Sequence, residues 1–183
     1  MDAYIYIRID PGKIAPVMSR LGTTQGVRNA VTVVGEWDVL ALVEGPDLSH
    51  IANSVLTGIH VIDGVLQTNT ALVVPADRVG LAGWGGASSP VPIPNVCFVH
   101  IKAEVGAAAG LVERMADFED VSGVAVLSGD NDLLVCVAQP WEIASGVILE
   151  QIHALPGVRS TNTLVSVKFE EPDEDRDQFS TWS

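Results

Sequence analysis

Apolar and polar positions follow the same succession of patterns in the two halves of this chain. In the first half, residues 3–10 alternate between isoleucine and larger or charged residues, which predicts a strand. Apolar residues recur at helical spacing in residues 13–24 and again in residues 47–59. Three further strands are predicted by apolar, partly β-branched runs at residues 27–34, 39–44 and 66–74. The predicted order is therefore β-α-β-β-α-β.

The second half repeats this order with an offset of about 94 residues, which indicates an internal duplication. The predicted strands are residues 96–104, 121–127, 133–138 and 160–169, and the predicted helices are residues 107–118 and 141–155. Each copy has the element order of the ferredoxin-like fold. In that fold both helices cover one face of an antiparallel sheet, so the other face remains to be accounted for.

The central strands indicate what covers that other face. Residues 39–43 and 133–137 are apolar at every position, whereas a strand with one solvated face should alternate. We therefore expect the open faces to be buried on each other, within one chain or between chains. The predicted fold class is α+β, with two tandem ferredoxin-like (βαββαβ) domains in the sheet-to-sheet pairing of a dimeric α/β barrel.

The composition along the chain suggests where these domains end. We expect a first domain at residues 1–74, a linker rich in Gly, Pro and Ser at 75–95, a second domain at 96–169, and a disordered acidic tail at 170–183. Trp84 is an unusual residue for such a linker. Its ring either packs on a nearby surface or recognises a partner, and the acidic tail is a candidate docking segment for a protein partner.

Charge and cysteine usage exclude several classes of function. The formal net charge is −13, and only 10 residues are Lys or Arg, without a cluster, which argues against direct contact with nucleic acid. No uncharged stretch is long enough to span a membrane, and the first residues do not look like a signal peptide. Cys97 and Cys136 fall in apolar strands and are expected to be buried free thiols in a cytoplasmic protein.

Two motifs recur in order in both copies. The hairpin between the two central strands reads Gly35-Glu36-Trp37-Asp38 in the first copy and Gly129-Asp130-Asn131-Asp132 in the second. The entry to the last strand reads Gly64-Val65-x-x-Thr68-x-Thr70 and then Leu155-Pro156-Gly157-Val158-x-x-Thr161-x-Thr163. With the β-α-β-β-α-β order, these motifs resemble the ligand-binding domain of the Lrp/AsnC family, also called the RAM domain. Asn131 departs from the family pattern, which has an aromatic residue at that position.

The resemblance implies a non-enzymatic module that senses a small molecule, with an amino acid as the expected effector, and that forms homo-oligomers. Regulators of this family carry a helix-turn-helix DNA-binding domain before the RAM domain, whereas this sequence begins on the first predicted strand. Any effect on transcription or metabolism is therefore expected to be indirect, through protein partners. No cofactor is expected.

The ligand-binding residues that the motifs suggest are Gly35, Trp37, Asp38, Thr68, Thr70, Gly129, Asp132, Thr161 and Thr163. Each hairpin aspartate would meet the ammonium group of an amino acid, and the glycine N–H groups would meet its carboxylate. A structural alternative is that the aspartates close the turns through backbone N–H groups and that the threonines only favour strands. Because Asn131 replaces the aromatic residue, the two sites are expected to be unequal.

Two other functions remain open. A dimeric α/β-barrel enzyme would use the sheet face between the copies as its pocket, lined by Tyr6, Arg8, His100 and Lys102. A purely structural oligomer would use its acidic tail to dock a partner. The sequence contains no catalytic or phosphate-binding motif and no metal-ligand spacing, so no catalytic and no metal-binding residues are predicted.

Overall fold

The structure is a computed structural model that describes residues 1–75, 78 and 89–169. The first half comprises β1 (Asp2–Ile9), α1 (Ile14–Leu21), β2 (Val27–Val34), β3 (Val39–Glu44), α2 (Leu48–Asn53), η1 (Ser54–Ile59) and β4 (Val65–Val74). The second half comprises β5 (Cys97–Ala103), α3 (Ala108–Ala116), β6 (Val121–Ser128), β7 (Leu133–Val137), α4 (Trp141–Gly146), η3 (Val147–Ile152) and β8 (Val158–Val167). The predicted βαββαβ order is confirmed in both copies.

All eight strands form one closed barrel in the order β1-β3-β2-β8-β5-β7-β6-β4. The two copies are joined at two antiparallel seams, where Val34 pairs with Val165 and Leu72 pairs with Ser128. The sheet-to-sheet pairing predicted from the apolar strands is therefore present, and it takes place within one chain. Since the barrel closes on itself, the open sheet faces need no second chain to cover them.

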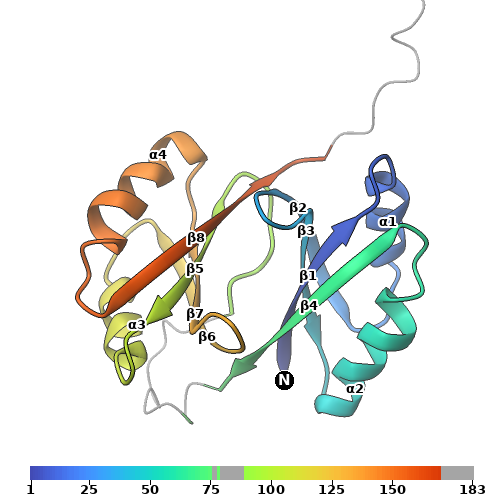
Figure 1. Ribbon diagram of the computed structural model, residues 1–183, viewed down its shortest axis with the longest axis horizontal. Helices are drawn as coiled ribbons and strands as arrows, with labels where there is room; N and C mark the ends of the chain where they lie inside the picture. Colours follow the sequence, from blue (N-terminus) through green and yellow to red (C-terminus); the bar gives the residue numbers. More distant parts are fainter. Residues whose placement is uncertain (76–77, 79–88, 170–183) are drawn as a thin grey trace, which may run out of the picture.

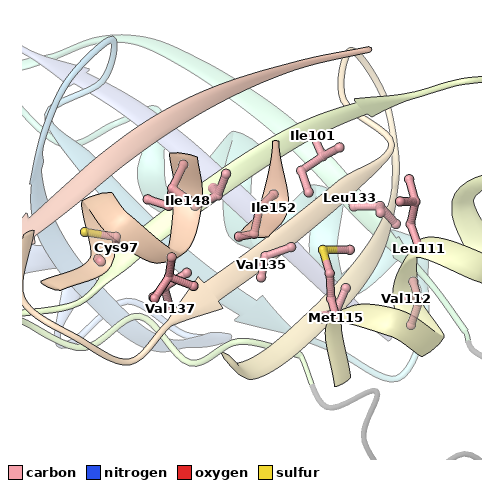
Figure 2. Packing of buried hydrophobic residues seen from close by; sticks show 14 of the residues in the cluster. Cys97, Ile101, Leu111, Val112, Met115, Leu133, Val135, Val137, Ile148 and Ile152 are labelled. Atoms are coloured by element: carbon pink, nitrogen blue, oxygen red, sulfur yellow. The ribbon is translucent and has the colours of Figure 1, made fainter. Parts of the chain in front are cut away.

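The apolar side chains form three layers. Figure 1 shows the helices on the outer sides of the strands. α1 and α2 pack on the outer face of β1–β4, and α3 and α4 pack on the outer face of β5–β8. In the second outer layer, Leu111 and Met115 from α3 meet Ile101, Leu133 and Val135 from the strands (Figure 2). A third layer lies inside the barrel, where Tyr4, Leu40, Phe98, Leu134 and Leu164 are buried between the two sheets.

The second helix of each copy changes its winding halfway along. The sequence predicts one continuous helix over residues 47–59 and another over 141–155, but each consists of an α-helical half followed by a π-helical turn. The turns close through bonds five residues apart, from His60 N to the Val55 carbonyl and from His153 N to the Ile148 carbonyl, both at 2.9 Å. π-Helical turns are rare and often lie at functional sites.

The described end of the segment that leads into the second copy is bonded to β1. The buried Tyr4 hydroxyl donates to the Pro90 carbonyl at 2.7 Å, and Ser89 donates to Asp2 at 2.9 Å. Trp84 and the acidic tail, both singled out in the sequence, lie outside the described residues. Of the helices that the structure describes, none has the length and apolar character needed to cross a membrane.

Candidate functional site

A cavity of about 380 Å³ lies between the two copies and opens to solvent. Its wall combines residues from matched positions of the duplication. They are Tyr6, Glu36, Trp37 and Asn69 from the first copy and His100, Lys102, Asp130, Asn131, Ser160, Thr161 and Asn162 from the second. We call this cavity the inter-copy pocket.

The buried part of the pocket is formed by one residue from each copy. Tyr6 lies on β1 and His100 occupies the equivalent position on β5, and each is only 4% exposed. The Tyr6 hydroxyl and His100 Nε2 are 2.8 Å apart, and the two rings meet edge to face with centroids 5.0 Å apart. A direct hydrogen bond therefore connects the two copies inside the barrel.

Burial fixes the protonation of this pair. Desolvation lowers the pKa of His100 to about 4, although a hydrogen bond to the backbone of Asn162 acts in the opposite direction. Since that bond favours the charged ring, it runs from a ring N–H to the Asn162 carbonyl. In the neutral ring, Nε2 is then the acceptor, and the Tyr6 hydroxyl donates to it. Burial also raises the pKa of Tyr6, so the phenol stays neutral and its oxygen keeps lone pairs that can accept hydrogen bonds.

On the side of the first copy, the rim of the pocket is held together by contacts among Arg8, Glu36 and Trp37. The Arg8 guanidinium lies 5.1 Å from the centre of the Trp37 ring, and Arg8 Nε donates to the Glu36 carbonyl at 3.2 Å. Trp37 is 9% exposed and packs 6.0 Å from Tyr6. Asn162 Nδ2 donates to Glu36 Oε2 at 3.0 Å, which ties the last strand of the second copy to this hairpin.

The two predicted aspartates stabilise the strands beside the pocket. Asp38 Oδ2 accepts a hydrogen bond from the Ile9 N–H, and Asp132 Oδ2 accepts one from the Ala103 N–H, both at 2.8 Å. Both N–H groups follow a register shift, after Arg8 in β1 and after Lys102 in β5. Each carboxylate therefore holds a β-bulge, a feature that re-aims neighbouring side chains. This is a backbone role of the kind raised as the structural alternative.

The predicted threonines lie beside the pocket residues rather than with them. Asn69 alternates with Thr68 and Thr70 on β4, and Asn162 alternates with Thr161 and Thr163 on β8, so the asparagines share the face of the barrel interior. Thr68 and Thr161 instead hydrogen-bond to the rings of His60 and His153, at 2.7 and 2.6 Å. Of the four threonines, only Thr161 also lines the inter-copy pocket.

Gly35 and Gly129 shape the two hairpins without lining the pocket. Their φ angles are 148° and 150°, in a region that strongly favours glycine. A Cβ atom on Gly35 would lie 2.8 Å from Leu164 Cδ2, whereas one on Gly129 would have no neighbour within 4 Å. The first hairpin is thus packed on the other copy, and the second is open.

The sequence motifs did not identify several residues of the pocket. Trp37 and Thr161 were predicted as ligand-binding residues, and Tyr6, His100 and Lys102 belong to the set expected for a barrel enzyme. Glu36, Asn69, Asp130, Ser160 and Asn162 were not predicted. The signal for the asparagines was available, because both copies read Thr-Asn-Thr. In the described part of the chain, no group of three or more His, Cys, Asp or Glu residues gathers as a metal site.

Comparison with known proteins agrees with this architecture. Residues 2–76 and 96–175 match the Lrp/AsnC ligand binding domain. A search of curated proteins finds no match. Among solved structures, the siroheme decarboxylase NirDL in complex with an iron-uroporphyrin III analogue is similar over 92% of this chain and 71% of that chain, at 10% identity and a TM-score of 0.66. At this identity the likeness concerns the fold alone.

Two further structures have lower TM-scores. TTHA0845 from Thermus thermophilus is 26% identical over 38% of this chain and 86% of its own length, with a TM-score of 0.37. AsnC from E. coli is 14% identical over 54% of this chain and 68% of its own, also with a TM-score of 0.37. Since the matched residues 2–76 and 96–175 make up most of the sequence, this chain belongs to the Lrp/AsnC ligand-binding domain family.

Proposed function

We propose that this chain is a non-enzymatic sensor that binds one small amphoteric molecule, of the amino-acid class, in the inter-copy pocket. The observation that carries the proposal is the wall of the pocket, which combines charges of both signs with amide groups. Lys102 is cationic, whereas Glu36 and Asp130 are anionic. A zwitterion can meet both signs at once, with charge-assisted hydrogen bonds to each.

The size and floor of the pocket support the same ligand class. Small-molecule sites span roughly 300–1,000 Å³, so the cavity of about 380 Å³ suits a compact ligand. The Tyr6 oxygen can accept a hydrogen bond from a ligand at the floor, and Trp37 offers an apolar face for a side chain. The ligand would contact both copies and would stabilise the closed barrel by mass action.

The wider role follows from the family. We propose that occupancy of the pocket changes how the protein associates with copies of itself or with other proteins, and that transcription or metabolism responds indirectly, in the cytoplasm. The expected homo-oligomer would use the outer surface, because the inner sheet faces are already covered. Leu48 and Leu56 in the first copy and Trp141 and Leu149 in the second are about half exposed or more on the second helix of each copy.

Calorimetric titration with the individual amino acids tests the proposal. A specific amino acid should bind with one site per chain and should raise the melting temperature. Lys102→Ala should weaken binding about tenfold or more, since it removes a charged hydrogen-bond donor. Thr70→Val is the matched control, because Thr70 belongs to the predicted motif but does not line the pocket.

The two variants also separate the pocket from the site that the motifs predicted. If Thr70→Val weakens binding and Lys102→Ala does not, the ligand binds at the Thr-x-Thr motif. If no amino acid binds or raises the melting temperature, the sensor hypothesis fails.

A second candidate, a barrel enzyme, is favoured by the buried Tyr6–His100 pair. A neutral imidazole that accepts a phenol proton can act as one half of an acid–base pair. The similar fold of NirDL suggests a carboxylated tetrapyrrole as the substrate to try. Siroheme incubated with the protein should then lose carboxyl groups, which mass spectrometry detects. Both Tyr6→Phe and His100→Gln should abolish the reaction. Unchanged siroheme with the full-length protein would argue against this candidate.

A purely structural role is the third candidate. It predicts that neither amino acids nor tetrapyrroles bind, and that removal of residues 170–183 abolishes the binding of a partner protein.

A further inference from the structure

A second hollow, of about 490 Å³, lies on the first copy only, away from the inter-copy pocket. It is bounded by the loop between α1 and β2, the end of β3, α2 and the π-helical turn η1. The lining residues are Thr24, Gln25, Gly26, Glu44, Gly45, Pro46, His50, Asn53, Ser54, Thr57 and Gly58. We call it the glycine groove.

Three hydroxyl groups line this groove, and all have used their only proton. Thr24 donates to the Arg20 carbonyl at 2.8 Å, Ser54 to the His50 carbonyl at 3.0 Å, and Thr57 to the Asn53 carbonyl at 2.8 Å. A hydroxyl has one donor and two acceptor lone pairs. Toward a ligand, these three groups can therefore act only as acceptors.

The ionisable residues of the groove have the same character. His50 Nδ1 lies 2.8 Å from Asp47 Oδ1, and hydrogen bonds from the His50 side chain and backbone lower the pKa of Asp47. An ionised carboxylate only accepts, so Nδ1 carries the proton in this contact. Glu44 is anionic and pairs through Oε1 with Arg28, which does not line the groove. The described wall contains no lysine or arginine.

The second copy carries different side chains at the equivalent positions. Equivalent positions are identified by equivalent bonds, from Glu44 N to the Gly26 carbonyl and from Ala138 N to the Asp120 carbonyl, both at 2.8 Å. Asp120 thus replaces Gly26, and the following residue, Gln139, replaces Gly45. Gln139 Nε2 donates to Asp120 Oδ1 at 2.8 Å. In the second copy, two side chains that the first copy lacks are therefore bonded to each other.

The first copy has glycine at both of these positions, and neither position tolerates a larger residue. An added Cβ would lie 2.3 Å from Ser54 Oγ at Gly26 and 2.9 Å from His50 Cβ at Gly45. Close packing keeps both positions small, so the first copy has no side chain in place of Asp120 or Gln139. The acceptors of the groove meet no lysine or arginine in its described wall. The amide groups of Gln25 and Asn53 present either a donor or an acceptor, so they do not change this balance.

We propose that the glycine groove binds a cationic nitrogen group, an ammonium or a guanidinium, against Glu44 and the acceptors around it. The group belongs either to a free small amine or to a lysine or arginine side chain of a partner protein. This site is independent of the inter-copy pocket and of the function proposed for it.

Titration of the ¹⁵N-labelled full-length protein with agmatine, followed by NMR, tests the proposal. The solution is kept at physiological salt so that diffuse attraction to the acidic surface is screened. Amide shifts should be confined to residues 24–26, 44–45 and 54–58, and Glu44→Gln should weaken binding about tenfold or more. A second titration uses a capped Gly-Arg-Gly peptide in place of agmatine. Tighter binding of the peptide indicates a protein partner, and tighter binding of agmatine indicates a free amine.

A matched pair of hydroxyl variants makes the test specific. Thr57→Val removes an acceptor of the groove and should weaken binding. Thr23→Val is the control, because the Thr23 hydroxyl likewise donates to a backbone carbonyl, that of Arg20, but does not line the groove. Sodium acetate should cause no localised shifts. The proposal is overturned if the agmatine shifts are absent, or if they scatter over the acidic surface and Glu44→Gln leaves them unchanged.

Discussion

The two copies share one hydrogen-bonded framework but differ in the side chains mounted on it. Asp38 and Asp132 hold their bulges with the same 2.8 Å bond, and the rings of His60 and His153 meet matched threonines. The hairpin walls differ, with a buried Trp37 in the first copy and a half-buried Asn131 in the second. The hydrogen bonds that both copies share thus define the fold. The residues that differ, Trp37 and Asn131, give the pocket an apolar side and a polar side.

Replacement of the hairpin aromatic residue should give the largest difference between the copies. Trp37→Ala removes a ring that contacts Tyr6 and Arg8, so we expect a loss of about 3 kcal/mol in the free energy of unfolding. Asn131→Ala should cost under about 1 kcal/mol, because the side chain is partly exposed. Urea denaturation of both variants measures this difference. Equal losses would show that the two hairpins contribute alike.

Acid should act mainly through the second copy, because His100 occupies the position of Tyr6. The pKa of His100 in the folded protein is about 4, below its ordinary value of 6.5, so the unfolded chain binds the proton more tightly. The resulting stabilisation is complete above pH 6.5 and is lost as the pH falls toward 4. Its ceiling is about 3 kcal/mol.

The difference between wild type and His100→Gln, measured by denaturation across this pH range, isolates the effect. Tyr6→Phe is the matched control from the first copy, and it should keep the acid dependence because its phenol stays neutral at these pH values. If His100→Gln loses stability in acid as steeply as wild type does, the buried histidine is not the group that titrates.

The framework aspartates should respond alike in the two copies. Asp38→Ala and Asp132→Ala each leave one backbone N–H of a bulge without its acceptor, so each should lose about 1–2 kcal/mol. Thermal denaturation measures both losses. If Asp38→Ala abolishes ligand binding at temperatures where the fold is intact, the carboxylate also contacts the ligand, as the hairpin motif suggested.

Apolar periodicity was sufficient to predict the element order and the face-to-face sheets, because burial of residues 39–43 and 133–137 is a local property of the sequence. Two features could not be predicted from apolar periodicity. The π-helical turns depend on how each helix packs on its strands. The bonds from Asp38 to Ile9 and from Asp132 to Ala103 link separate strands, so the hairpin motif alone could not distinguish a bulge-holding aspartate from a ligand-binding one.

The pocket was predictable in part for a related reason. Tyr6 and His100 are polar-tipped residues on strands whose neighbours are apolar, and the duplication aligns them, so their meeting inside a barrel followed once the sheets were paired. Asn69 and Asn162 were not predicted, because each lies between two threonines that match the family motif. A strand alternates its faces, so residues between two motif positions belong to the opposite surface.

The smallest expected effect concerns the two hairpin glycines. Gly35→Ala and Gly129→Ala share the same backbone strain, because their φ angles are 148° and 150°. Only the methyl group at position 35 meets another residue closely, since it would lie 2.8 Å from Cδ2 of the fully buried Leu164 and 3.3 Å from the Thr163 carbonyl oxygen. Gly35→Ala should therefore be more destabilising by about 1 kcal/mol. Leu164→Ala in the Gly35→Ala background should relieve the excess, and a double-mutant cycle without coupling would show that the hairpin does not press on β8.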